Sequence, residues 1–147
     1  MKNSIKRILS FLLTLCVISS LSAVIALAAV QSSDYLDSYR ATVIAQSGGR
    51  IVVLVDVSGC GIMDEIGANA IYLYESQDNV NFYRVGTYNH NDYPAMMTSD
   101  STDYYDTPIT YNGTPGYYYK ASVYVYAGKN GGGDQRNYLT ASKRAIN

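Results

Sequence analysis

Hydrophobic and polar positions alternate most clearly between residues 117 and 127. Successive side chains of a β-strand point to opposite faces, so one set of alternate residues faces the core. The odd-numbered set, which includes Ala121, Val123 and Val125, is the apolar one. This set predicts the buried face of a strand. The opposite face carries three tyrosines, Tyr118, Tyr124 and Tyr126, together with Lys120 and Ser122.

Six further runs have the same strand character. They are short, rich in β-branched and aromatic residues, and bounded by glycine or polar turn residues. They span residues 39–45, 50–58, 70–76, 81–88, 107–111 and 137–143. The polar segment 89–106 has no clear period and is expected to cross between sheets. Since helical periodicity is almost absent, the chain is predicted to be all-β: a seven-strand antiparallel β-sandwich, fibronectin III- or immunoglobulin-like.

A cluster of turn residues, 112–116, leads into the clearest strand. A tyrosine that follows such a turn can bond its hydroxyl back to the backbone of the corner, as in the tyrosine corners of sandwiches. Tyr117 and Tyr119 are the two candidates for this role.

The first 28 residues have the pattern of a secretory signal peptide. A positive start is followed by an uncharged apolar run over residues 8–27 and by a small-x-small cleavage site that ends at Ala28. The positive residues are Lys2, Lys6 and Arg7. Cleavage would leave a secreted chain, residues 29–147, which is short enough to be one domain.

Two alternatives to cleavage follow from the same segment. The apolar run is long enough to remain as a membrane anchor. Cys16 invites a lipoprotein interpretation, but it lies in the middle of the run, without a small residue before it. Cleavage is the favoured interpretation.

Removal of the leader changes the charge balance. The mature chain keeps 8 basic and 12 acidic residues, a net charge near −4. Nucleic acids and anionic membranes are bound through basic surfaces. Neither is therefore expected as a partner of the mature chain.

One cysteine, Cys60, remains after cleavage, so no internal disulfide is expected. An odd cysteine in a secreted protein can pair between chains or react. Beside Gly59 and Gly61, it is more often a small buried hydrophobe, which is the favoured interpretation.

Several segments resemble known domains. Residues 71–88 are similar to the central hairpin of a fibronectin type III-like domain, and residues 114–130 to its penultimate strand. Three motifs together resemble a family of small secreted proteins of Gram-positive bacteria, a domain family of unknown function. These motifs are Met-Asp-Glu-Ile-Gly-Ala (63–68), Tyr-Leu-Tyr-Glu-Ser (72–76) and Ala-Gly-Lys-Asn-Gly-Gly-Gly-Asp (127–134). The resemblance covers nearly all of the mature chain. It implies a lone secreted β-domain and transfers no activity or catalytic residue.

Tyrosine is the compositional outlier, with 16 residues against two phenylalanines and no tryptophan. Its flat apolar ring and its hydroxyl suit contacts with sugars and proteins, although tyrosine also simply suits strands. The outward row of Tyr118, Tyr124 and Tyr126 is the candidate ligand-binding surface, because aromatic rings on a solvated face require an explanation. Cover by another element of the chain is the alternative.

A second candidate site lies at one pole, where the connections 59–69 and 128–136 of a sandwich are expected to meet. Their carboxylates are candidate oxygen ligands for Ca²⁺. The residues are Asp64, Glu65 and Asp134. Ion pairs with Lys129 or Arg136 are the ordinary alternative. No other cofactor is expected.

Enzyme chemistry finds little support in the sequence. The single histidine, His90, lies in the irregular segment, and the chain has no Gly-x-Ser-x-Gly nucleophile elbow. The predicted function is a non-catalytic, secreted binding domain. It is expected to engage a protein or cell-surface partner through polar loops or a strand edge. The alternative is a carbohydrate-binding module that uses the outward tyrosine row.

Overall fold

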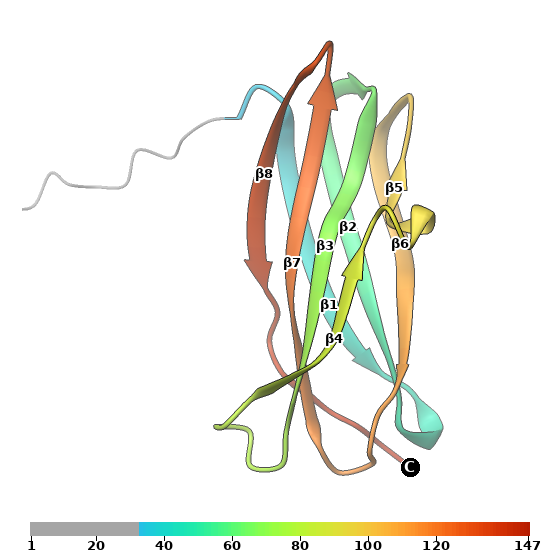
Figure 1. The fold of residues 1–147 in the computed structure, drawn as a ribbon, viewed down its shortest axis with the longest axis vertical. Coiled ribbons are helices and arrows are strands. Elements are labelled where there is room, and N and C mark those ends of the chain that lie inside the picture. Colours follow the sequence, from blue (N-terminus) through green and yellow to red (C-terminus); the bar gives the residue numbers. More distant parts are fainter. Residues whose placement is uncertain (1–32) are drawn as a thin grey trace, which may run out of the picture. The chain divides into compact units, whose positions relative to one another are not determined.

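The structure is a computed structural model that describes residues 33–147 (Figure 1). The predicted leader, residues 1–28, lies outside the described residues. The described elements are β1 (Leu36–Ala45), the 3-10 turn η1 (Ser47–Gly49), β2 (Arg50–Met63), β3 (Glu65–Ser76), β4 (Tyr83–Asn89), the 3-10 turn η2 (Pro94–Met96), β5 (Met97–Thr98), β6 (Ser101–Asn112), β7 (Tyr118–Lys129), β8 (Gly132–Leu139) and β9 (Lys143–Arg144). Within residues 33–147, no helix is long and apolar enough to cross a membrane.

Two antiparallel sheets form a sandwich. One sheet has the order β1-β2-β6, and the other has the order β4-β3-β7-β8, with β5 paired to β3 and β9 paired to β7. The β4-β3-β7-β8 sheet lies in front in Figure 1. The predicted all-β antiparallel sandwich is thus confirmed. Seven of the strands contain seven or more residues, and β5 and β9 contain two each.

The core lies between the two sheets and follows from the alternation of the strands. In β2, Val55 and Val57 have no exposed surface, and in β7 the same holds for Val123 and Val125. Ile71 of β3, the cross-strand partner of Val123, is also fully buried. Complete burial of such a side chain contributes about 1.5–3 kcal/mol. Packing therefore stabilises a fold whose described residues contain a single, unpaired cysteine.

The segment that links β4 to β6 crosses from one sheet to the other, as its lack of period predicts. Met96, in η2, is fully buried. The hydroxyl of Tyr104, in β6, donates a 2.5 Å hydrogen bond to the carbonyl oxygen of Ala95. Burial raises the pKa of Tyr104 well above its usual range. These contacts tie the crossing segment to both sheets.

The predicted tyrosine corner is present, and Tyr119 forms it. Its side chain is fully buried, and its hydroxyl accepts a 2.8 Å hydrogen bond from the backbone N–H of Thr114. The ring also covers Gly113, where an added Cβ would lie 2.7 Å from a ring carbon. The turn 112–116 is thereby held against the start of β7.

Three predicted connections are shorter than expected. β6 begins at Ser101, so residues 101–106 of the predicted connection 89–106 are strand. β2 continues to Met63 and β3 begins at Glu65, so most of the segment 59–69 is strand. β8 begins at Gly132, five residues before the predicted start at 137. Its first six residues carry no apolar side chain on either face, as an edge strand that pairs only with β7 allows. Hydrophobic alternation therefore gives no signal for its first half.

Two edge strands carry features that oppose pairing with another chain. β6 contains Pro108, which has no N–H to donate. In β8, Asp134 and Arg136 lie opposite Ala127 and Val125, both fully buried, so these charges are on the inward side of the edge. Proline and inward charges are both known devices against edge-to-edge aggregation.

Candidate functional site

The outward face of the β4-β3-β7-β8 sheet gathers most of the features that point to binding. On β7, alternation with buried Tyr119, Ala121 and Val123 turns Tyr118 and Tyr124 outward, as predicted. On β3, Ile71 and Leu73 are fully buried, so the neighbouring Tyr72 and Tyr74 face outward in the same way. We call this surface the aromatic face and define it by its outward rings. They are Tyr72, Tyr74, Tyr118, Tyr124 and Tyr126.

The three tyrosines of the predicted row have three different surroundings. Tyr124 meets Tyr72 edge to face, with ring centroids 5.6 Å apart and an interplanar angle of 79°. The guanidinium of Arg144 lies over Tyr118, 5.9 Å from the ring centroid. Between Tyr118 and Tyr124 lie five residues of β7, a separation of roughly 20 Å along the strand. They are therefore not one continuous row.

Tyr126 has a structural role that the sequence pattern did not reveal. Its ring lies over two glycines, Gly128 and Gly133, which are cross-strand partners in β7 and β8. An added Cβ would lie 2.7 Å from a ring carbon at Gly128 and 2.8 Å from one at Gly133. A ring that covers glycines in this way supplies the contacts that their missing side chains lack.

A shallow groove of about 400 Å³ lies within the aromatic face. Three rings line it, those of Tyr74, Phe82 and Tyr124. Its polar groups come from Lys120, Ser122 and Asn137. Leu139, which is 60% exposed, completes the lining. The groove thus combines apolar rings with an amide, a hydroxyl and one cation.

The polar groups of the groove have fixed relations to one another. The ammonium of Lys120 lies 3.9 Å from the centroid of the Phe82 ring, a cation–π contact. The hydroxyl of Ser122 donates a 2.9 Å hydrogen bond to Oδ1 of Asn137. The amide oxygen of Asn137 is thereby occupied, so this side chain can offer a ligand its Nδ2 hydrogens.

Charge is distributed unevenly over the two outward faces. Around the groove, the charged groups are basic: Lys120 in the groove, Arg84 over Tyr72 at 5.4 Å, and Arg144 over Tyr118. β4 and β7 contain no acidic residue. In β3, Glu65 lies at the far end of the face, and Glu75 accepts a hydrogen bond from the hydroxyl of buried Tyr119.

The outward face of the β1-β2-β6 sheet carries acidic as well as basic side chains. Asp56 lies there between buried Val55 and Val57, opposite Arg40 of β1. Asp103 accepts a 2.7 Å hydrogen bond from the hydroxyl of Ser58, which lowers its pKa. A net acidic chain therefore presents one sheet face whose groove is surrounded by positive charge.

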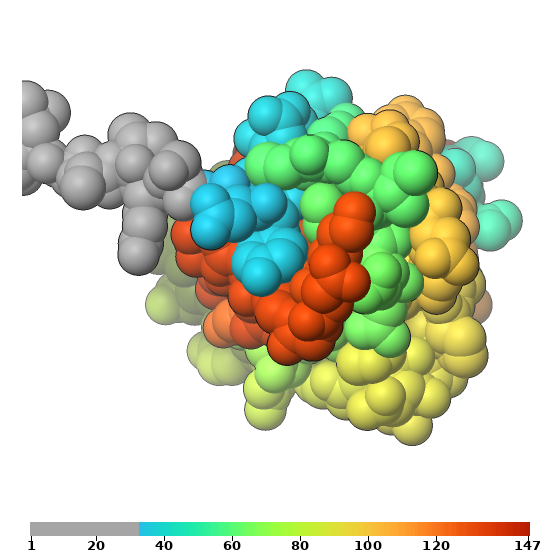
Figure 2. Space-filling view, turned by 90° about the horizontal axis from the view of Figure 1, so that it is seen from above, coloured from blue at the N-terminus to red at the C-terminus, as the bar shows by residue number. Residues whose placement is uncertain are grey.

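The predicted pole is formed by the β2–β3 and β7–β8 turns, which meet as expected (Figure 2). The carboxylate of Asp64 accepts a 2.6 Å hydrogen bond from the backbone N–H of Asn130, and the N–H of Asp64 donates to Gly128 at 2.9 Å. Asp64 and Glu65 line a shallow depression of about 380 Å³ at this pole. Asp64 therefore holds the two turns together.

Asp134 does not join the other two carboxylates of the candidate metal site. It pairs with Arg136 at 2.7 Å, one of the ion pairs that the sequence offered as the alternative. Among residues 33–147, no group of three or more histidine, cysteine or acidic side chains is placed to hold a metal ion. The contacts of Asp64 and Asp134 are those of a turn and an ion pair.

The favoured interpretation of Cys60 as a buried hydrophobe is wrong. Cys60 is exposed, and within residues 33–147 its thiol makes a long contact of 3.6 Å with the carbonyl oxygen of Ser33. Its backbone N–H bonds to the carbonyl oxygen of Tyr35, so the strand turns the side chain outward. Of the flanking glycines, Gly59 is tightly packed, with an added Cβ 2.8 Å from Cγ of Met63, whereas Gly61 has no atom within 4 Å of an added Cβ.

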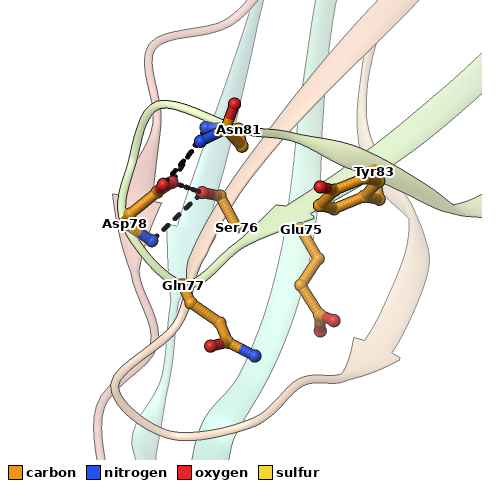
Figure 3. A pocket seen from close by; sticks show the side chains of 6 residues that line it. All are labelled: Glu75, Ser76, Gln77, Asp78, Asn81 and Tyr83. Carbon is orange, nitrogen blue, oxygen red and sulfur yellow. Dashed lines mark hydrogen bonds between the residues drawn. The ribbon is translucent and has the colours of Figure 1, made fainter.

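A further depression lies beside the β3–β4 turn (Figure 3). Asp78 organises this turn: its carboxylate accepts hydrogen bonds from the backbone N–H groups of Asn81, at 2.8 Å, and Val80, at 2.9 Å, and from the hydroxyl of Ser76. These bonds hold the pKa of Asp78 well below its usual range. The Asp78 carboxylate is used within the turn, and Glu75, which also lines the depression, accepts a hydrogen bond from the Tyr119 hydroxyl, so both carboxylates already have partners.

Comparison of the chain with protein-family models, with curated proteins and with solved structures finds no match. The assignment of function thus rests on the chain's own residues.

Part of the aromatic face was not predicted from the sequence. The outward position of Tyr72 and Tyr74 could have been predicted, because they alternate along residues 70–76 with the apolar residues Ile71 and Leu73, which are buried. Phe82, Asn137 and Leu139 join the groove only through the pairing of distant strands, which a single sequence does not specify. To predict the groove, one would need to know which residues lie beside β7 across the sheet.

Proposed function

We propose that the chain is a secreted, non-catalytic binding domain that engages a cell-surface partner through the aromatic face. The observation that carries this proposal is the groove, where rings and polar groups converge on an open sheet face. Tyr74, Phe82 and Tyr124 supply apolar contact, and Lys120 and Asn137 supply directed polar groups. Rigid aromatic rings with adaptable polar neighbours are typical of binding surfaces.

The proposed location agrees with the signal pattern of residues 1–28 and with the resemblance to the secreted family of Gram-positive bacteria. That resemblance assigns no reaction. A binding role is also consistent with the groove's single charged lining residue, Lys120. A protein bound through polar loops or a strand edge remains the competing candidate within the same class.

The test uses the protein as it is secreted. The chain is expressed with its leader and collected from the medium, and its first residue is determined; we expect Ala29. The protein is labelled on the exposed thiol of Cys60, and its binding to the surface of the cells that secrete it is measured by flow cytometry.

A matched pair of double variants locates the binding surface. Arg84→Gln with Lys120→Gln removes two positive charges from the aromatic face. Arg40→Gln with Arg50→Gln removes two from the other sheet. We expect at least tenfold weaker binding for the first pair and less than a twofold change for the second. Equal losses, or no binding by the wild type, would contradict the proposal.

A further inference from the structure

We propose that the groove of the aromatic face binds an acidic glycan, a saccharide whose rings carry carboxylate or sulfate groups. The inference rests on the proposed function and names the chemical class of its partner. The carrying observation is that Lys120, Phe82, Tyr124 and Asn137 line one groove.

The rings of the groove suit a sugar's apolar side. A pyranose presents C–H groups on its two faces and hydroxyls around its edge. The rings of Tyr74, Phe82 and Tyr124 offer apolar surface for contact with the C–H faces of the sugar. The side-chain amide of Asn137, whose oxygen accepts a hydrogen bond from Ser122, offers its N–H donors to the sugar hydroxyls.

The charges specify an acidic ligand. In the cross-strand row formed by Arg84, Tyr74 and Lys120, two cations stand on either side of a tyrosine. Adjacent strands are about 4.8 Å apart, so the backbones of these two cations are separated by roughly 10 Å. Arg144 adds a third cation beside Tyr118. No carboxylate lines the groove, so its lining presents no negative charge that would repel an anion.

The position of the groove on a sheet face disfavours an acidic peptide. Peptides added to a sheet bind through main-chain hydrogen bonds at an edge. β7 lies between β3 and β8, and its ladder bonds are already made with both neighbours. A ligand here meets side chains alone, which suits a saccharide with many hydroxyls better than an extended peptide.

Size is consistent with a short oligosaccharide. A volume of about 400 Å³ lies within the range of small-ligand sites, roughly 300–1,000 Å³. The groove is open to solvent rather than enclosed, so a longer polymer can continue beyond it along the face. The absence of tryptophan predicts modest affinity for each sugar, with avidity supplied by the polymer.

The test measures the binding of three probes by calorimetry. Oligogalacturonate carries sugar rings and carboxylates, malto-oligosaccharide carries rings alone, and poly-glutamate carries carboxylates on a peptide. We expect oligogalacturonate to bind at least tenfold more tightly than either of the others. Preference for poly-glutamate would assign the face to an acidic protein and overturn the proposal, and so would equal affinity for all three.

Matched lysine variants then locate the binding. Lys120→Gln is expected to weaken oligogalacturonate binding at least tenfold. Lys143→Gln removes the same charge on the opposite side of the sheet, where Lys143 pairs with buried Tyr119, and is expected to change binding less than twofold. Equal losses would overturn the assignment. Melting temperatures of both variants check that the fold is intact.

A second readout keeps the assignment testable if Lys120→Gln does not fold. In the wild-type protein, titration with oligogalacturonate should shift the backbone amide resonances of Lys120, Tyr124 and Asn137 more than those of Asp64 or Asp78. Shifts confined to other regions would overturn the proposal. Binding of wild-type protein to cells but not to the acidic saccharide would contradict this inference and leave the proposed function standing.

Discussion

The hydroxyl of Tyr119 donates a 2.5 Å hydrogen bond to Oε2 of Glu75, a residue 44 positions earlier in the chain. The same hydroxyl accepts from the N–H of Thr114. One buried ring thus connects β3, β7 and the turn before β7. Burial and the bond to Glu75 raise the pKa of Tyr119 to about 12.

Tyr119→Phe removes this connection. A hydrogen bond to a charged group contributes roughly 1.5–3 kcal/mol, so we expect the free energy of unfolding to fall by about 2 kcal/mol at pH 7. Tyr117→Phe, at the other corner candidate, is the control and should cost less than about 0.5 kcal/mol. Urea unfolding of both variants provides the measurement. Equal costs would show that Tyr119 holds no special bond.

The pH dependence of the same variant has a definite sign. The folded pKa of Tyr119, about 12, exceeds the ordinary value of about 10, so the folded state retains a proton that the unfolded state releases. The contribution of Tyr119 to stability is therefore full below pH 10 and is lost as the pH rises through 12. The stability gap between the wild type and Tyr119→Phe should narrow over this range. A gap that stays constant would be inconsistent with the raised pKa.

Asp78→Asn tests the β3–β4 turn. Because hydrogen bonds lower the folded pKa of Asp78, its contribution to stability is present above the ordinary pKa of about 4 and declines as the pH falls below it. We expect Asp78→Asn to melt at a lower temperature than the wild type at pH 7, with a difference that shrinks in acid. Asp92→Asn, at an exposed aspartate, is the control. A difference independent of pH would exclude this linkage.

Gly67 provides a test of close backbone contact. An added Cβ at Gly67 would meet the carbonyl oxygen of Met96 and lie 2.9 Å from Cα of Met97, both backbone atoms. Gly61 has almost the same φ, +153° against +150°, but has no atom within 4 Å of an added Cβ. Both substitutions to alanine carry backbone strain, and only Gly67→Ala adds the clash, at about 1–3 kcal/mol. Thermal melting should show this excess, and equal effects would argue against the contact between β3 and β5.

The exposed thiol of Cys60 should react in the native state. We expect one equivalent of a thiol reagent to label Cys60 in the folded protein within minutes at pH 8, without denaturant. Cys60→Ser should abolish the signal and leave the melting temperature within about 2 °C of the wild type, because surface substitutions usually change stability by less than about 0.5 kcal/mol. Labelling that requires unfolding would show that the thiol is covered.

Much of the fold follows from local alternation. Val55, Val57, Val123 and Val125 occupy alternate positions in strong strand patterns, and each is buried as the pattern predicts. These are interior positions of central strands, where hydrophobic burial dominates the choice of residue. Tyr119 follows in the same way from the turn chemistry before β7.

The remaining features depend on pairing between strands. The first half of β8 contains Asp134 and Arg136 on its inward side, so no apolar period marks it. Its strand structure comes from hydrogen bonds to β7. The groove likewise joins Phe82 to Lys120, which are 38 positions apart. Such neighbours are fixed by register, and register is a property of the assembled sheet.

Because charge is unevenly distributed over the molecule, the ionic strength of the solution should control the binding of a polyanion to the aromatic face. In about 0.01 M salt the Debye length is roughly 30 Å, so a polyanion senses the net charge of residues 33–147 as a whole, near −4 (8 basic and 12 acidic residues), and is repelled. In about 0.15 M salt it is roughly 8 Å, and a polyanion close to Arg84 and Lys120 senses mainly these cations. Capture should therefore be strongest at an intermediate salt concentration, where distant repulsion is screened and local attraction survives. The molecule would thus be released in very dilute water as well as in brine.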